Sequence, residues 1–118
     1  MNFQQAVQTC FRKYVDFSGR ASRPEYWWFV LAYVILSFVA RFINDYLYLL
    51  VVLAFLLPLL AAGARRLHDV GKSAWLLLIG LIPVVGGLVL LYFTVQPSQT
   101  ESNAYGPPPP PQPQPAGV

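Results

Sequence analysis

The sequence predicts an all-α integral membrane protein, with three transmembrane helices after an N-terminal amphipathic interfacial helix. Composition is the first indication, because 56% of the 118 residues are hydrophobic and only 11% are charged, against about 25% in soluble domains. The second is the grouping of the apolar residues into three runs of membrane-spanning length, 26–42, 46–64 and 74–95. A water-soluble fold of this size could not bury so much apolar surface, so lipid is expected to solvate it.

Residues 1–21 are expected to form an amphipathic helix and a turn. Phe3, Val7, Cys10, Phe11 and Tyr14 recur at helical spacing, with polar residues on the opposite face. Basic residues flank the aromatic face, which favours a helix lying in the membrane interface. Packing on the other helices is an alternative that can hold at the same time. Cys10 is expected to be a small buried hydrophobe.

A three-span domain is expected over residues 22–95. Ser22 and Glu25 have the spacing of a capping box, and Pro24 suits a first helical turn, so the first helix should begin near Ser22. Aromatic residues at the start of the first run mark a lipid–water boundary. Pro58 lies inside the second run, where a membrane helix tolerates proline, usually with a kink.

The third run is long enough to cross a bilayer, since 22 helical residues extend about 33 Å. Pro83, Gly86 and Gly87 interrupt it near the middle. A kink with close helix packing is one interpretation, and a broken helix that lines a small-solute site is another. A hairpin bent at these residues is the alternative topology, in which each half, about 11 residues, would be too short to cross.

Residues 96–118 are expected to be a disordered proline-rich tail, because five consecutive prolines cannot continue a helix or pack a core. The basic residues predict the orientation. With three spans, seven of the eight lie on one side of the membrane and Arg41 alone on the other. The positive-inside rule then places the N-terminus in the cytoplasm and the tail outside.

A polar hinge at residues 65–75 joins the second and third runs. One interpretation is structural: arginine, histidine and aspartate satisfy one another, and Gly71 caps the preceding helix. The other is a cytoplasmic-face site for an anionic lipid headgroup or another phosphate-bearing ligand, since guanidinium groups and helix N-termini suit phosphate. Under either interpretation the candidate residues are Arg20, Arg23, Glu25, Arg65, Arg66, His68, Asp69 and Lys72.

Other classes of site lack the residues they need. His68 has no second histidine or cysteine nearby, so no metal or cofactor site is expected. The sequence shows no catalytic triad and no paired carboxylates, and we expect no enzymatic activity. The basic residues form no extended stripe, which argues against nucleic acid. The expected partners are membrane lipids, anionic ones included, with further copies of the chain or another membrane protein.

Two charged motifs stand out: F-x-x-Y-x-x-F-S-G-R-A-S-R-P-E-Y-W-W over residues 11–28 and R-R-L-H-D-V-G-K-S-A-W over residues 65–75. Shorter elements are Leu57-Pro58, Ile82-Pro83 with Gly86, and N-A-Y-G-P from Asn103. With these elements the chain resembles a bacterial family of small integral-membrane proteins, domain of unknown function 805. Ala74 departs from the glycine expected there. The resemblance implies an inner-membrane location and a helical fold of a few spans, and it supplies no established activity, cofactor or catalytic residue.

The leading hypothesis is therefore a non-enzymatic accessory or lipid-interacting component of the bacterial inner membrane. One alternative is a small oligomeric transporter or channel, although the second run has no polar side chain beyond Tyr46 and Tyr48. The other alternative is a membrane enzyme that acts on phospholipids through arginine, His68 and Asp69.

Overall fold

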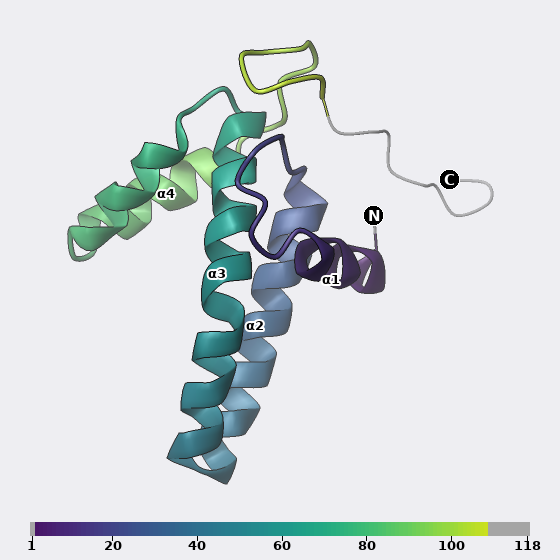
Figure 1. The fold of residues 1–118 in the computed structure, drawn as a ribbon. Helices are drawn as coiled ribbons and strands as arrows, with labels where there is room; N and C mark the ends of the chain where they lie inside the picture. Colours follow the sequence, from purple (N-terminus) through teal and green to yellow (C-terminus); the bar gives the residue numbers. More distant parts are fainter. Residues whose placement is uncertain (1, 109–118) are drawn as a thin grey trace.

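The computed structural model describes residues 2–108, and every regular element in this range is helical. A long hairpin of two helices forms its axis, and the other elements gather around one end of that hairpin (Figure 1). In chain order the elements are α1 (Phe3–Arg12), α2 (Arg23–Ile43), α3 (Asp45–Asp69), the 3-10 helix η1 (Ala74–Leu81) and α4 (Val85–Thr94). The prediction of an all-helical fold is confirmed for the described residues.

The α2–α3 hairpin begins and turns where local signals place it. The Ser22 side chain accepts a hydrogen bond from the backbone N–H of Glu25 at 3.4 Å, and Pro24 lies in the first turn, so the predicted start of α2 is confirmed. Asn44 alone separates the two helices, and its side chain accepts from the N–H of Leu47 at 2.7 Å. In residues 2–108, α2 and α3 are the two helices long and apolar enough to cross a membrane.

Aromatic rings fill the junction of the first three helices. Phe29 of α2 and Phe55 of α3 stack with their ring centroids 5.3 Å apart. Phe11, near the C-terminal end of α1, contacts both rings edge-on, with centroid distances of 5.3 Å to Phe29 and 5.2 Å to Phe55. Cys10 is fully buried beside them, as the sequence predicts. The N-terminal helix therefore packs across the hairpin through its apolar face.

Pro58 has a hydrogen-bonding consequence within α3, where it is fully buried. Proline carries no N–H for the carbonyl group four residues earlier, which here belongs to Ala54. The hydroxyl group of Tyr14 donates to that carbonyl oxygen at 3.2 Å. The segment after α1 thus supplies the hydrogen bond that the proline removes from the helix.

Residues 74–95 do not form the single continuous helix expected of a third span. The run divides into η1 and α4, which fold back on each other around residues 82–84 (Figure 1). Pro83 cannot continue an α-helical ladder, and Val84 has a φ angle of +65°, a conformation that reverses the chain and is costly for a β-branched residue. The chain therefore bends at the sequence interruptions, at the position where the alternative hairpin has its bend.

The prediction of a disordered tail from residue 96 is also corrected. The backbone N–H of Gln99 donates to the carbonyl oxygen of Asp69 at 3.0 Å, and Asn103 and Gly106 exchange two backbone hydrogen bonds. Residues 96–106 consequently lie against the end of α3, at the same end of the molecule as the polar hinge. Three spans would have placed them at the opposite end. Residues 109–118 lie outside the described residues.

The hairpin between η1 and α4 depends on Gly86. A Cβ atom at this position would lie 1.7 Å from the carbonyl oxygen of Ile79, whereas a Cβ atom at Gly87 would meet nothing within 4 Å. We expect Gly86→Ala to lower the free energy of unfolding by about 1–3 kcal/mol, because the two segments must separate. Gly87→Ala is the matched control and should be neutral or slightly stabilising. Thermal unfolding in detergent measures both, and equal midpoints would contradict the close approach.

Candidate functional site

Five ionisable side chains meet where α2 begins and α3 ends, and we call them the clasp: Arg20, Glu25, Arg65, Arg66 and Asp69. None exposes more than 6% of its surface. Burying charges in a protein is costly unless they are paired and hydrogen-bonded. The partners of each group therefore decide what the clasp can do.

Asp69 is the centre of the clasp. Its carboxylate accepts from the Nε of Arg20 at 2.9 Å and from an Nη of Arg66 at 2.6 Å. The hydroxyl group of Ser98 donates to the same carboxylate. Since Asp69 is the last residue of α3, its negative charge is unfavourable to the helix dipole, and the two cations compensate for it.

Arg20 and Arg66 also bind backbone carbonyl groups at the ends of two helices and in the segment after α4. Arg66 donates to the carbonyl oxygen of Thr94, the last residue of α4, at 2.9 Å. Arg20 donates to the carbonyl oxygen of Asp69 at 3.3 Å. Further carbonyl acceptors are those of Ala21 and Gln96 for Arg66, and those of Gln99, Glu101 and Gly106 for Arg20. The guanidinium groups thus hold the C-terminal ends of α3 and α4 together.

Arg65 forms the third ion pair of the clasp, with the carboxylate of Glu25. Its Nε donates to the carbonyl oxygen of Asp16 at 3.1 Å. Cys10 lies beside this pair, with its thiol 3.7 Å from the carbonyl oxygen of Glu25. Burial, and secondarily the charge of Glu25, raise the pKa of the Cys10 thiol to about 12. The thiol is therefore neutral at physiological pH and has no nucleophilic character.

His68 and the segment after residue 98 pack against each other at the C-terminal end of α3. The Nδ1 of His68 lies 2.9 Å from the carbonyl oxygen of Gly19, so this nitrogen carries the proton. Tyr105 stacks on the imidazole, with ring centroids 3.9 Å apart and the planes within 3°. The side-chain amide of Asn103 donates to the carbonyl oxygen of His68 at 2.9 Å. His68 therefore links residues 13–22, through Gly19, to residues 96–106, through Asn103 and Tyr105.

Gly71 ends α3 as the sequence predicts. It has a φ angle of +80°, and its N–H donates to the carbonyl oxygen of His68 at 3.0 Å. A Cβ atom here would also collide with the side chain of Gln99, at 2.6 Å. The glycine consequently permits both the helix stop and the return of the tail segment.

The structure brings six of the eight predicted site residues together and separates two. Arg23 and Lys72 are exposed and contact the last turn of α4 instead. Arg23 donates to the carbonyl oxygen of Val95 at 3.3 Å, and the Lys72 ammonium lies 5.4 Å from the centroid of the Phe93 ring. Sequence reasoning missed Ser98, Gln99, Asn103 and Tyr105, although polar residues around a glycine just before the proline run were a signal for an ordered turn.

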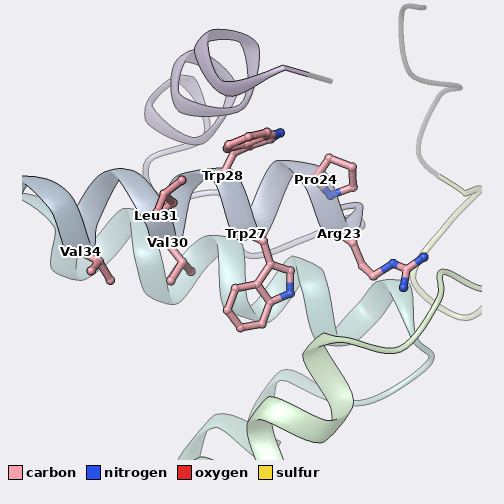
Figure 2. A pocket seen from close by; sticks show the side chains of 7 residues that line it. All are labelled: Arg23, Pro24, Trp27, Trp28, Val30, Leu31 and Val34. Carbon is pink, nitrogen blue, oxygen red and sulfur yellow. The ribbon is translucent and has the colours of Figure 1, made fainter. Parts of the chain in front are cut away.

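Two hollows adjoin the clasp. One, of about 640 Å³, is lined on one side by residues 15–19 and on the other by His68, Ala104 and Tyr105. There the hydroxyl group of Ser18, and secondarily its backbone N–H, donate to the Asp16 carboxylate and lower its pKa. The other hollow is a groove of about 680 Å³ along the outer face of α2, between α1 and α4 (Figure 2). Its lining is apolar except for one basic side chain: Arg23, Pro24, Trp27, Trp28, Val30, Leu31 and Val34.

Comparison with known proteins adds a family and curated relatives. The family described as "Protein of unknown function (DUF805)" matches residues 14–107. Inner membrane protein YhaI of Escherichia coli (strain K12) is 44% identical over 103 residues, covering 80% of this chain and 86% of the relative. Inner membrane protein YhaH of the same strain is 37% identical over 108 residues, covering 81% and 88%. No solved structure matches the chain. The matched range includes residues 98–106, which close the clasp.

Removing the charge at the centre of the clasp should destabilise the protein strongly. We expect Asp69→Asn to lower the free energy of unfolding by about 3–5 kcal/mol, because Arg20 and Arg66 then remain buried with an uncompensated charge. Asp45→Asn is the matched control, since Asp45 pairs with Arg41 on the surface at 3.3 Å and exposed pairs contribute about 1 kcal/mol or less. Thermal unfolding in detergent and the yield of folded protein measure the difference. Comparable losses in the two variants would show that the clasp is not structural.

Proposed function

This chain belongs to the DUF805 family of proteins of unknown function, and we propose that it acts as a non-enzymatic accessory component of the inner membrane. The observation that carries the proposal is that the buried charges of the clasp are paired with one another; within residues 2–108, one buried side-chain nitrogen, the Nη2 of Arg65, lacks a hydrogen bond. Both carboxylates are held by arginines, and the arginines are also bonded to backbone carbonyl groups. An acid–base or nucleophilic role requires a group that a substrate can reach, whereas these groups are buried.

In this proposal the clasp fixes a rigid platform at one membrane surface. The platform consists of residues 13–22, the end of α3 and residues 96–106, joined by hydrogen bonds from Arg20, Arg65 and Arg66. The helix α1 belongs to it through the packing of Phe11 on α2 and α3. Its side chains are organised for stability, and its outer surface remains available to a partner. The parts of Phe3 and Phe11 that helix packing leaves exposed, 41% and 38%, would place the platform in the membrane interface.

The proposed topology has two spans and a re-entrant hairpin. As an α-helix of 10 residues, α4 extends about 15 Å, half of a hydrocarbon core of about 30 Å. The run from residue 73 to residue 100 has no charged side chain. The turn satisfies backbone groups internally, since the N–H groups of Ile82 and Gly86 donate to the carbonyl oxygens of Ile79 and Ile82, at 2.9 and 3.0 Å. Such a turn suits insertion into hydrocarbon from one side.

Orientation in the proposal again follows from the basic residues. With a re-entrant hairpin, the N-terminus, the hinge and residues 96–106 share one side, together with seven of the eight basic residues. The positive-inside rule makes this side cytoplasmic. The transporter alternative is less favoured, because the rings of Phe29, Tyr33 and Phe55 occupy the interface between α2 and α3, where a path within one protomer would lie.

Single cysteines in a Cys10→Ala background test the topology. We expect a membrane-impermeant maleimide to label Tyr46→Cys in intact spheroplasts, since this exposed position adjoins the α2–α3 turn. Lys72→Cys and Ser102→Cys should be labelled only after lysis. Labelling of both Ser102→Cys and Tyr46→Cys in intact spheroplasts would support three spans in place of two. Labelling of Lys72→Cys in intact spheroplasts would reverse the orientation.

Lipid analysis tests the absence of enzymatic activity on phospholipids. We expect cells that overproduce the wild-type protein and cells that overproduce His68→Gln at equal abundance to have the same phospholipid composition. His68 borders the hollow between residues 15–19 and Tyr105 together with the titratable groups Asp16 and Tyr105. Histidine is the commonest general acid–base residue in enzymes, so His68 is the group chosen for the test. Lipid mass spectrometry measures the composition. A phospholipid species that changes with the wild type alone would support the enzyme alternative.

A further inference from the structure

The groove along α2 has walls that are held in place by specific contacts. The indole N–H of Trp27 donates to the carbonyl oxygen of Thr94 at 3.1 Å, which fixes this ring against α4. The ring of Trp28 meets Phe3 of α1 edge-on at 5.9 Å. Figure 2 shows the two indoles on opposite sides of the groove, with Val30, Leu31 and Val34 continuing along the helix. The groove is therefore a formed feature of the surface.

The dimensions of the groove match one leaflet of a bilayer. Eleven helical steps separate Arg23 from Val34, which corresponds to about 16 Å. Half of a hydrocarbon core is about 15 Å thick. Tryptophan residues near the α2 N-terminus are at the depth where the headgroups lie. An acyl chain along this face would thus extend from the membrane surface to the bilayer midplane.

Two basic residues that the clasp does not use, Arg23 and Lys72, lie at or near the polar end of the groove. In the described residues, Arg23 makes one hydrogen bond, to the Val95 carbonyl oxygen, although a guanidinium group has five N–H donors. Lys72 contacts the same last turn of α4 through Phe93 and adds positive potential at this depth. The arginines of the clasp are buried, whereas Arg23 is exposed. Arg23 is therefore the arginine of this end that can reach an external phosphate.

We propose that the groove binds an anionic phospholipid, with one acyl chain along residues 27–34 and the headgroup phosphate at Arg23. The site takes its depth and orientation from the topology proposed above. An apolar groove with one cationic end matches an amphiphile with an apolar tail and an anionic head. A second copy of the chain fits less well, because a symmetric contact of two α2 faces would bring the two Arg23 side chains together. Of the arginines predicted for an anionic-lipid site, Arg23 is therefore kept at the groove, whereas Arg20, Arg65 and Arg66 belong to the clasp.

The test uses the full chain reconstituted in vesicles of equal parts phosphatidylglycerol and phosphatidylcholine, then released into mild detergent for native mass spectrometry. We expect one retained phosphatidylglycerol per protein, and Arg23→Gln should lower its preference over phosphatidylcholine about tenfold, as loss of one charge-assisted hydrogen bond implies. Arg41→Gln removes an exposed arginine at the other end of α2 and should leave the preference unchanged. Val34→Trp should reduce retention of both lipids by filling the groove, whereas Phe38→Trp, one turn beyond it, should not.

Three results would overturn the proposal: Arg23→Gln with the wild-type preference, an equal loss in Arg41→Gln, or a dimer without lipid, which would identify a second copy as the occupant. Thermal unfolding of each variant separates lost binding from lost folding. Cysteine labelling separates this site from the proposed topology. If labelling supports two spans and lipid retention is unspecific, the groove proposal alone fails. If Lys72→Cys is labelled from outside while retention persists, the orientation alone fails.

Discussion

The carboxylate of Asp69, held between Arg20 and Arg66, is the interaction on which the rest of the structure depends. The clasp contains three arginines and two carboxylates, so one positive charge remains for the backbone to compensate. The C-terminal carbonyl groups of α3 and α4 supply that compensation. A straight third span would carry Thr94 about 33 Å from the hinge. Arg66 would then be buried without this acceptor, which explains why the apolar run folds back.

Local signals in the sequence were sufficient to predict much of the hairpin. Ser22 and Pro24 start α2, and Gly71 stops α3, because capping depends on residues within one turn. The return of α4 depends on contacts that no short window contains. Gly86 approaches the backbone of Ile79, and Arg66 reaches a carbonyl group 28 residues later. The length and charge of the third apolar run therefore left both a straight helix and the η1–α4 hairpin possible.

The candidate site was predictable only in part, for the same reason. The spacing of Arg66 and Asp69 predicts their contact, which forms. Arg65 has an equally suitable spacing to Asp69 but pairs with Glu25, 40 residues away. Arg20 and Arg23 are three residues apart, yet the first is buried and the second exposed, since α2 begins between them. Spacing identified the charged residues, whereas their acceptors depended on the tertiary fold.

The distance along the chain between Arg20 and its acceptors has a consequence for biosynthesis. Two of these acceptors, the carbonyl groups of Glu101 and Gly106, follow it by 81 and 86 residues. Domains generally fold as they emerge from the ribosome, N-terminal parts first. Here a nascent chain exposes α1, α2 and α3 to the translocon while the first arginine still lacks those acceptors. Arg20 can therefore complete its hydrogen bonds only after residues 101–106 have been synthesised, and a chain truncated before them leaves this buried guanidinium group short of two acceptors.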